Sequence, residues 1–241
     1  MPITKIVMMI AAIVLSACIS APVELSKTAE DDYKKALQYM ENENYPNAVL
    51  FLEKFSAKYP YSQYATNAEL LRLKAAYLDG QYVLSETLGL RFIDAHPDHK
   101  DRVYAQFTVA MSYYKQSSSA ELDQQFSHKS RDAFLELNQQ FPNNAYVADI
   151  EKYLNILTNR VAEHELIVGK FYFEKKLYVA ALNRLLLIKN QYANANIIDE
   201  SLYYLVASYA ALEQQDLAKE TKAILKREHP QSPWLVKAKN L

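Results

Sequence analysis

A pair of residues recurs along the chain: an aromatic or histidine residue followed, in all but one case, by proline. This repeated pair constrains the fold more than any other feature. The pairs are Tyr59-Pro60, His96-Pro97, Phe141-Pro142 and His229-Pro230, with Tyr192-Ala193 as a degenerate member. Twelve residues before the second member of each pair stands a small residue: Ala48, Ser85, Ser130, Ala181 and Ala218. Proline stops a helix because it lacks an N–H and clashes with the preceding turn, whereas small residues let two helices cross closely. The pattern therefore predicts five helical hairpins.

Two further positions keep the same phase. Nine residues before the small residue stand Tyr39, Ala76, Tyr172 and Tyr209, and an insertion moves Tyr113 to seventeen residues before Ser130. Three residues earlier again stand Ala36, Leu73, Ala110, Gly169 and Val206. These markers form the skeleton of the tetratricopeptide repeat. We expect an all-α protein, a tetratricopeptide-like superhelix of five helical hairpins. Ser232 as N-cap and Pro233 at the first helical position predict a C-terminal capping helix.

The spacing of the small residues locates two irregularities. Ala48 to Ser85 and Ala181 to Ala218 both measure 37 residues, whereas Ser85 to Ser130 measures 45 and Ser130 to Ala181 measures 51. A polar insertion around 116–125 explains the first excess, and a helix lengthened over 145–175 explains the second. We therefore predict an N-terminal module of repeats 1–3 over 29–144. A C-terminal module over 145–241 would contain the long linking helix, repeats 4–5 and the cap.

The first 17 residues have the pattern of a secretory signal peptide. Lys5 precedes an apolar run from Ile6 to Ala17, which as a helix would span about 18 Å, short of the ~30 Å hydrocarbon core. Leu15-Ser16-Ala17-Cys18 resembles the lipobox of bacterial lipoproteins. The resemblance implies cleavage before Cys18 and lipidation of that cysteine, palmitate included, so that 18–28 is a lipidated tether. Ile19, where inner-membrane lipoproteins carry aspartate, implies transfer to the outer membrane, facing the periplasm.

Composition and motifs exclude several classes of function. Lys and Arg number 27 against 28 for Asp and Glu, so the sequence lacks the basic excess that nucleic-acid binding requires. The single cysteine excludes a disulfide framework. His164-Glu165 begins like a zinc-binding helix motif, but Val168 stands where the second histidine belongs. No glycine-rich phosphate loop occurs. We expect no catalytic site, no cofactor and no metal ion.

The order of these motifs resembles that of the BamD (ComL) lipoproteins of outer-membrane β-barrel assembly. The matching segments are Tyr33–Ala36, Tyr45–Ala48, Tyr59–Ser62, His96–His99, Arg131–Phe134, Phe141–Asn143 and Ala181–Arg184. The resemblance implies a non-enzymatic scaffold of the β-barrel assembly (BAM) complex, which helps to insert β-barrel proteins into the outer membrane. It implies three partners: the POTRA domains of BamA, other BAM lipoproteins, and C-terminal segments of unfolded outer-membrane proteins. A pilotin-like lipoprotein that escorts a secretin or pilus component, or a peptidoglycan-associated lipoprotein, remains the alternative.

Aromatic residues recur on the first helices of the first three repeats, which in this repeat class line a concave groove. By register, the predicted substrate-peptide groove contains Tyr33, Tyr77, Tyr104, Phe107 and Tyr114, with Lys74 at its edge. Tyrosine combines apolar area with a hydroxyl that tolerates water, and a lysine suits a peptide carboxylate. The alternative is that these side chains pack between neighbouring hairpins.

Asn183 and Arg184 stand on the second helix of the fourth repeat. Register places Arg184 on the outward side of that helix, in a segment that is otherwise apolar apart from Asn183. The resemblance implies that this pair docks the POTRA domains, a task for which the planar guanidinium is suited because it can pair with a carboxylate through two hydrogen bonds. The alternative for Arg184 is an ordinary solvated arginine.

Overall fold

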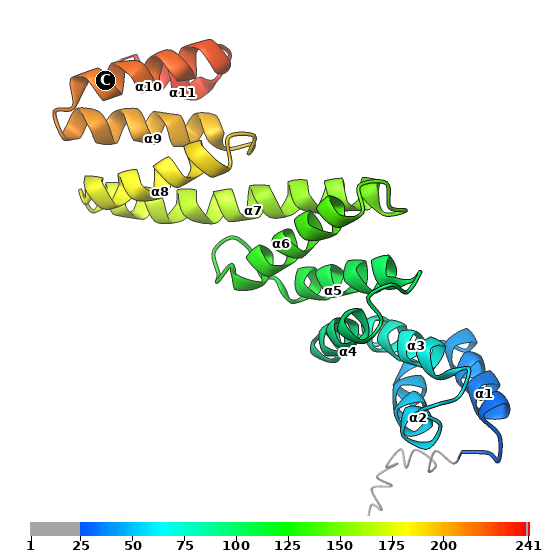
Figure 1. Cartoon of the computed structure of the whole chain (residues 1–241). Coiled ribbons are helices and arrows are strands. Elements are labelled where there is room, and N and C mark those ends of the chain that lie inside the picture. The colour runs from blue at the N-terminus through cyan, green and yellow to red at the C-terminus, as the bar shows by residue number, and fades with distance from the viewer. Residues whose placement is uncertain (1–24, 240) are drawn as a thin grey trace, which may run out of the picture.

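A computed structural model describes residues 25–239 and 241, and within these residues the chain contains helices and no strand. The predicted signal peptide and Cys18 lie outside the described residues. The helices are α1 (Ala29–Glu41), α2 (Tyr45–Lys58), α3 (Ala65–Leu78), α4 (Tyr82–Ala95), α5 (Arg102–Gln116), α6 (Gln125–Gln140), α7 (Val147–Glu174), α8 (Tyr178–Gln191), α9 (Ile198–Ala211), α10 (Gln215–Glu228) and α11 (Pro233–Ala238) (Figure 1).

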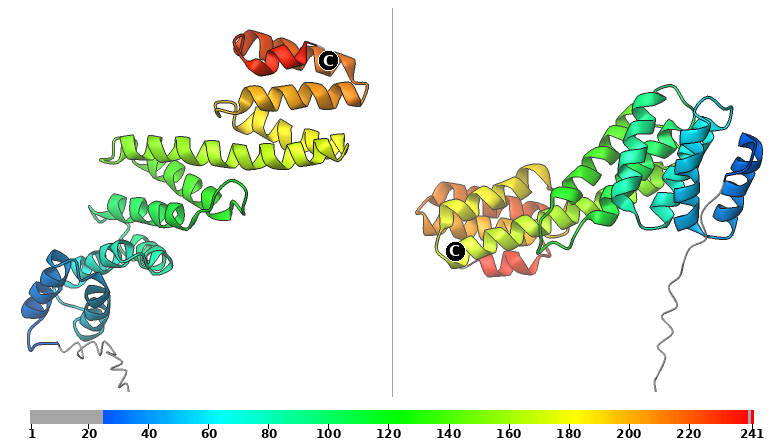
Figure 2. Two further views of the ribbon diagram at one scale, coloured as in Figure 1. Left: turned by 180° about the vertical axis from the view of Figure 1, so that it is seen from behind. Right: turned by 90° about the horizontal axis from the view of Figure 1, so that it is seen from below.

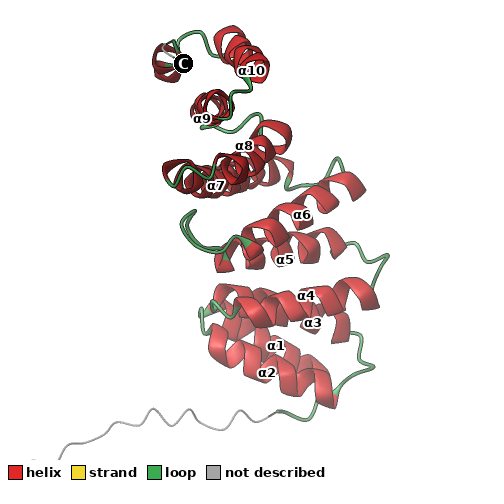
Figure 3. Cartoon of the chain, turned by 90° about the vertical axis from the view of Figure 1, so that its left-hand side faces the viewer, coloured by secondary structure: helices red, strands yellow, loops and turns green. Residues whose placement is uncertain are grey.

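Consecutive helices pair into hairpins that stack along an elongated array (Figures 1 and 2). The pairs are α1/α2, α3/α4, α5/α6, α7/α8 and α9/α10, and each helix packs against its neighbours in chain order. Seen from the side, with the stack rising from α1 to α10, most of the connecting loops lie at its two edges (Figure 3). Helix α11 packs against α9 and α10, and the Ser232 hydroxyl accepts the N–H of Trp234 at its start. The predicted all-α fold of five hairpins with a C-terminal cap is confirmed.

The repeat markers act as the sequence predicts. Ala48, Ser85, Ser130 and Ala181 are fully buried, and Ala218 is 4% exposed. Each aromatic or histidine before the proline position caps the second helix of its hairpin, as Tyr59 does by donating its N–H to the Phe55 carbonyl. Tyr192 ends α8 with φ of −130°, the value found at the proline-linked His96 and His229, although alanine follows it. Its ring is 3% exposed, so burial of the capping ring marks this helix end without a proline.

The short turn inside each regular hairpin contains a residue with left-handed backbone geometry. The positions are Glu43, Gly80, Lys176 and Glu213, with φ of 54°, 77°, 60° and 60°. Only one of the four is glycine, the residue that adopts this conformation without a steric penalty. The third hairpin lacks this turn because the insertion replaces it.

Helix α7 runs from the third hairpin into the fourth. Its first half buries Ile150 and Leu157 with α5 and α6, and its second half buries Val161 and Leu166 with α8 and α9. A Cβ atom on Gly169 would lie 3.1 Å from the Leu185 side chain, so α7 and α8 cross closely there. The 28-residue helix matches the lengthened helix predicted over 145–175, whereas the boundary between two modules at residue 144 stays a prediction.

The insertion between α5 and α6 packs onto the middle of α7. Arg160 Nη1 donates a hydrogen bond to Ser117 Oγ, and His164 Nδ1 lies 2.7 Å from the Ala120 carbonyl oxygen. Asn159 Oδ1 accepts the N–H of Asn196, at 2.7 Å, from the loop that leads into α9. The same stretch of α7 is therefore held by the third hairpin on one side and the fifth on the other.

The chain before α1 is fastened to the first hairpin. Ser26 N donates to Oδ1 of the fully buried Asp32 at 2.6 Å, and Tyr59 Oη donates to its Oδ2 at 2.9 Å. Lys58 Nζ donates to the Ser26 carbonyl oxygen at 2.5 Å. These bonds fasten Ser26, within the predicted tether, to the first hairpin. Among the described helices, none combines the length and the apolarity needed to cross a bilayer.

Candidate peptide groove and partner surface

Four of the six predicted groove residues line a single pocket of about 170 Å³ between α3 and α5. They are Lys74 and Tyr77 from α3 and Tyr104 and Phe107 from α5; Leu78, Thr108, Met111 and Tyr146 complete the lining. Tyr104, Phe107, Thr108 and Met111 follow the i, i+3, i+4, i+7 spacing that places side chains on one face of a helix. We call this pocket the aromatic groove.

The aromatic groove presents apolar rings with neutral hydroxyl groups. Burial raises the pKa of the Tyr77 hydroxyl to about 12, with smaller contributions from neighbouring tyrosines. Burial also raises the pKa of Tyr104 above its ordinary value. Both phenols therefore keep their protons at neutral pH and can donate hydrogen bonds. The Lys74 ammonium, on an exposed side chain, is the cation in the lining, so the groove suits an apolar ligand with a negatively charged group at one end.

Tyr33 and Tyr114 lie outside the aromatic groove. Tyr33 stacks on Tyr64, with ring centroids 5.1 Å apart and planes 18° apart. The Tyr114 ring lies 4.7 Å from that of Tyr153, and the Arg160 guanidinium lies 5.4 Å from its centroid. Both tyrosines thus pack against residues outside their own helix, which is the arrangement that the alternative interpretation describes.

Sequence reasoning missed Tyr146, which comes from the loop before α7. Its ring stacks on Phe107, with centroids 4.3 Å apart and planes 13° apart, and therefore forms part of the groove wall. The sequence contains a signal for this position, because a tyrosine recurs four residues after the proline: Tyr146 follows Pro142 as Tyr64 follows Pro60.

Arg184 lies closer to the fourth hairpin's own interface than its register predicts. Its Nη1 donates to Glu165 Oε2 at 3.1 Å, and the Glu165 side chain, on α7, is 8% exposed. The physical reason is the close helix crossing: Gly169 has no side chain, and a Cβ atom there would lie 3.6 Å from the Arg184 Cβ. The expectation that Arg184 faces away from the intra-repeat core is therefore wrong, although 43% of its side chain is exposed.

The exposed part of Arg184 borders a shallow surface pocket. Tyr172, Ala180, Asn183 and Leu187 line the pocket with it, and its volume is about 340 Å³. Three large apolar side chains around the α7–α8 turn, Phe171, Leu177 and Val179, are between 53% and 62% exposed. This end of the fourth hairpin therefore offers a guanidinium, an amide and apolar area to solvent.

The two histidines around Pro97 have structural partners. His96 Nε2 lies 2.9 Å from Glu69 Oε2, and His99 Nδ1 accepts the N–H of Asp101 at 3.1 Å. Within residues 25–239, no three histidine, cysteine or acidic side chains cluster closely enough to hold a metal ion.

Comparison with known proteins gives a consistent result over most of the chain. A family model named YfiO and described as "Outer membrane lipoprotein" matches residues 26–239. An "Outer membrane protein assembly factor BamD" of Rickettsia prowazekii is 29% identical over 202 residues, which cover 84% of this chain and 80% of the relative. The protein of the same name from Neisseria gonorrhoeae is 27% identical over 241 residues, covering 93% and 90%.

A solved structure titled "Functional Characterization of Pseudomonas Aeruginosa pilF" aligns with 87% of this chain and 95% of its own. The identity is 14% and the TM-score 0.39.

Proposed function

This chain belongs to the YfiO family of outer membrane lipoproteins, and we propose that it is a non-enzymatic scaffold in the assembly of outer-membrane β-barrel proteins. The observation that carries the proposal is the family match over residues 26–239, which spans all eleven helices described. The relatives that match most of the chain are named assembly factors BamD. The scaffold is anchored through lipid on Cys18 and faces the periplasm, in keeping with the lipobox at residues 15–18.

The aromatic groove receives C-terminal segments of unfolded outer-membrane proteins. An unfolded segment loses conformational freedom when it binds, and a preformed groove of packed rings reduces the ordering that the protein itself must undergo. Tyr77, Tyr104, Phe107 and Tyr146 supply apolar contact area, while Lys74 pairs with the terminal carboxylate. Aromatic side chains combine large contact area with few rotatable bonds.

The surface around Asn183 and Arg184 binds the POTRA domains of BamA, and other BAM lipoproteins join the same complex. Arg184 is held by Glu165 before binding, so little side-chain entropy is lost when a partner carboxylate approaches its exposed face. The apolar side chains at the nearby α7–α8 turn add area that can be buried.

Co-purification from detergent-solubilised cell envelope tests this function. The wild-type chain is expected to bring down a barrel-forming subunit with POTRA domains, and an Arg184→Ala chain is expected to bring down much less. Recovery of a secretin or of glycan fragments in its place would assign the chain to pilus assembly or to the cell wall and would refute the proposal.

A further inference from the structure

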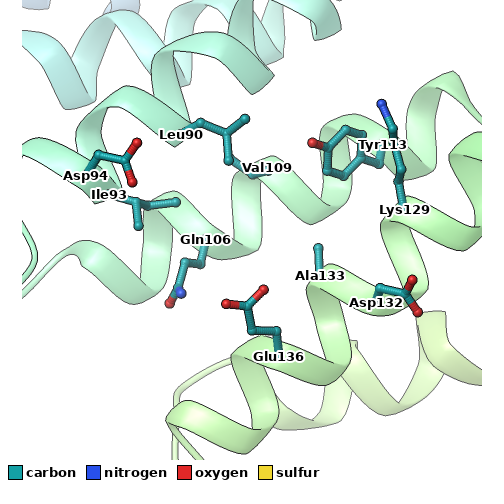
Figure 4. Close-up of a pocket in the computed structure, with 10 residues that line it drawn as sticks. All are labelled: Leu90, Ile93, Asp94, Gln106, Val109, Tyr113, Lys129, Asp132, Ala133 and Glu136. Atoms are coloured by element: carbon teal, nitrogen blue, oxygen red, sulfur yellow. The ribbon is translucent and has the colours of Figure 1, made fainter.

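A second and larger pocket lies on the opposite face of α5 from the aromatic groove. It has a volume of about 400 Å³ and is bounded by α4, α5 and α6. Its α5 residues are Gln106, Val109 and Tyr113, which at 100° per residue occupy the side of the helix opposite Tyr104, Phe107 and Met111. Because three carboxylates stand at its edge, on Asp94, Asp132 and Glu136, we call it the acidic pocket (Figure 4).

The floor of the acidic pocket is apolar. Leu90 and Ile93 of α4, Val109 of α5 and Ala133 of α6 line it. Val109 is 3% exposed, whereas Leu90 keeps 43% of its surface in solvent. An exposed leucine beside a preformed hollow leaves apolar area that a ligand's methylene groups can cover.

One end of the acidic pocket has a buried acceptor without a matching donor. Gln106 is nine-tenths buried; its Nε2 donates to Gln140 Oε1 at 2.8 Å, but its Oε1 has no hydrogen-bond partner among the described residues. Gln140 Nε2 donates in turn to Glu136 Oε1 at 2.9 Å. Figure 4 shows Gln106 and Glu136 directed towards one another at this end of the pocket. The relay of amides holds both side chains in place before any ligand arrives.

The cations nearby do not neutralise this end. Lys129 lies at the other end, where its Nζ is 5.4 Å from the Tyr113 ring centroid and 5.2 Å from that of Phe126 (Figure 4). Arg131 lies 3.5 Å from Asp132. Within residues 25–239, neither Asp94 nor Glu136 forms an ion pair. The pocket thus combines an apolar floor with two uncompensated carboxylates and a buried acceptor.

We propose that the acidic pocket is a docking site for a basic side chain, lysine or arginine, of a partner polypeptide. Such side chains have a long apolar stem and a cationic head, and they bury the stem on apolar surface while the head stays with polar groups. Here the stem covers Leu90, Ile93 and Val109, and the head donates to a carboxylate at the edge of the pocket, that of Asp94 or of Glu136. Hydrogen bonds between ionised partners are the stronger kind. The site is separate from the aromatic groove and does not depend on the function proposed above.

The experiment titrates the full mature chain, in detergent, with short capped peptides of the form alanine-X-alanine, where X is arginine, lysine, citrulline or norleucine. Methyl resonances of Ile93 and Val109 report on the acidic pocket, and the Met111 methyl reports on the aromatic groove. Arginine or lysine peptides are expected to shift the Ile93 and Val109 resonances saturably, and to bind about twofold to fivefold more tightly than the neutral citrulline and norleucine peptides.

Two variants with the same change in charge complete the test. Asp94→Asn with Glu136→Gln is expected to abolish the preference for the basic peptides. Asp216→Asn with Glu220→Gln, which removes two exposed carboxylates on α10, is expected to leave it intact. Norleucine binding as tightly as arginine, shifts confined to Met111, or a preference that survives in the Asp94/Glu136 variant would each overturn the proposal.

Discussion

Tyr146 stacks on Phe107, and the same two repeat positions hold Tyr64 on Tyr33 and Trp234 against Tyr203. One ring of each pair, Phe107, Tyr33 or Tyr203, lies three residues before the repeat position held by Ala110, Ala36 or Val206 on the first helix. The other ring, Tyr146, Tyr64 or Trp234, lies four residues after the proline position. Each pair joins the first helix of one hairpin to the start of the first helix of the next hairpin, or to the capping helix α11 in the case of Tyr203 and Trp234. In the third repeat alone, the pair also forms a wall of the aromatic groove.

Replacing Tyr146 with alanine is expected to lower both stability and peptide affinity. The stacked pair is worth about 0.5–1.5 kcal/mol beyond the area it buries, so the free energy of unfolding in urea should fall by about 1–3 kcal/mol in total. Tyr146→Phe keeps the ring and should behave nearly as wild type. Tyr61→Ala, at a side chain that is 99% exposed, is the control; an equal loss in both alanine variants would remove any special role for the stack.

Replacing Lys74 with glutamine is expected to weaken only ligands that end in a free carboxylate. An exposed ion pair contributes about 0.2–1 kcal/mol, so affinity for a C-terminal peptide of a barrel protein should fall by up to about fivefold. The same peptide with an amidated terminus should bind wild type and variant equally in a calorimetric titration. If the free and amidated peptides lose affinity equally, Lys74 does not pair with the terminal carboxylate.

The raised pKa of Tyr77 predicts a loss of stability at alkaline pH. An unfolded tyrosine loses its proton near pH 10, whereas the folded Tyr77 has a pKa of about 12. Between these values the folded state retains a proton that the unfolded state has released, so stability falls as pH rises from about 10 to 12. Burial and Glu86 raise the pKa of Tyr113 to about 12 as well, so Tyr77→Phe should remove part of the slope.

Urea unfolding at several pH values between 8 and 11.5 measures this slope. Tyr61→Phe, at a fully exposed position, should leave it unchanged. An unaltered slope in Tyr77→Phe would show that burial of this hydroxyl does not govern the alkaline loss.

Arg184→Ala is expected to have two separable effects. Binding to isolated POTRA domains should weaken by about 2 kcal/mol or more, as at an interface hot spot. Stability should also fall, by about 1–2 kcal/mol, because Glu165 is left buried without its cation. Adding Glu165→Gln to Arg184→Ala should restore most of the stability but none of the binding. Recovery of both in the double variant would mean that Arg184 acts only within the fold.

Cys18→Ala is expected to leave the protein folded and to release it from the membrane. The residue precedes every helix described, and acyl chains supply about 0.8 kcal/mol for each methylene group buried in the bilayer. Fractionation of cells that lack the barrel-assembly partners isolates the anchor from protein contacts. Sedimentation of the variant with outer membranes in such cells would count against the lipobox.

The parts of the fold that sequence predicts are those set by local chemistry. Small residues at helix crossings and prolines at helix ends act on their own turn, so five hairpins and the cap follow from their spacing. The sequence does not predict the left-handed backbone at Glu43, Lys176 and Glu213. Glutamate and lysine do not favour that geometry, and the hairpin imposes it. Arg184 was misplaced because its orientation depends on Gly169 and Glu165 of another helix. The groove predicted from sequence does not include Tyr146, because that prediction uses the register of the first helices and Tyr146 lies in a loop.

The hydrogen bonds from Ser26 to Asp32 and from Lys58 to Ser26 set the length of chain between Cys18 and the first hairpin. Eight residue-to-residue steps separate Cys18, the proposed site of the lipid, from Ser26, and fully extended they span at most about 29 Å. With the lipid in the bilayer, the first hairpin cannot move farther than that from the membrane surface. The last hairpin, at the opposite end of the stack (Figure 1), can lie farther from the membrane by up to the length of the stack. An anchor at one end of the stack therefore limits how far the first hairpin lies from the membrane and leaves the orientation of the stack to the partners.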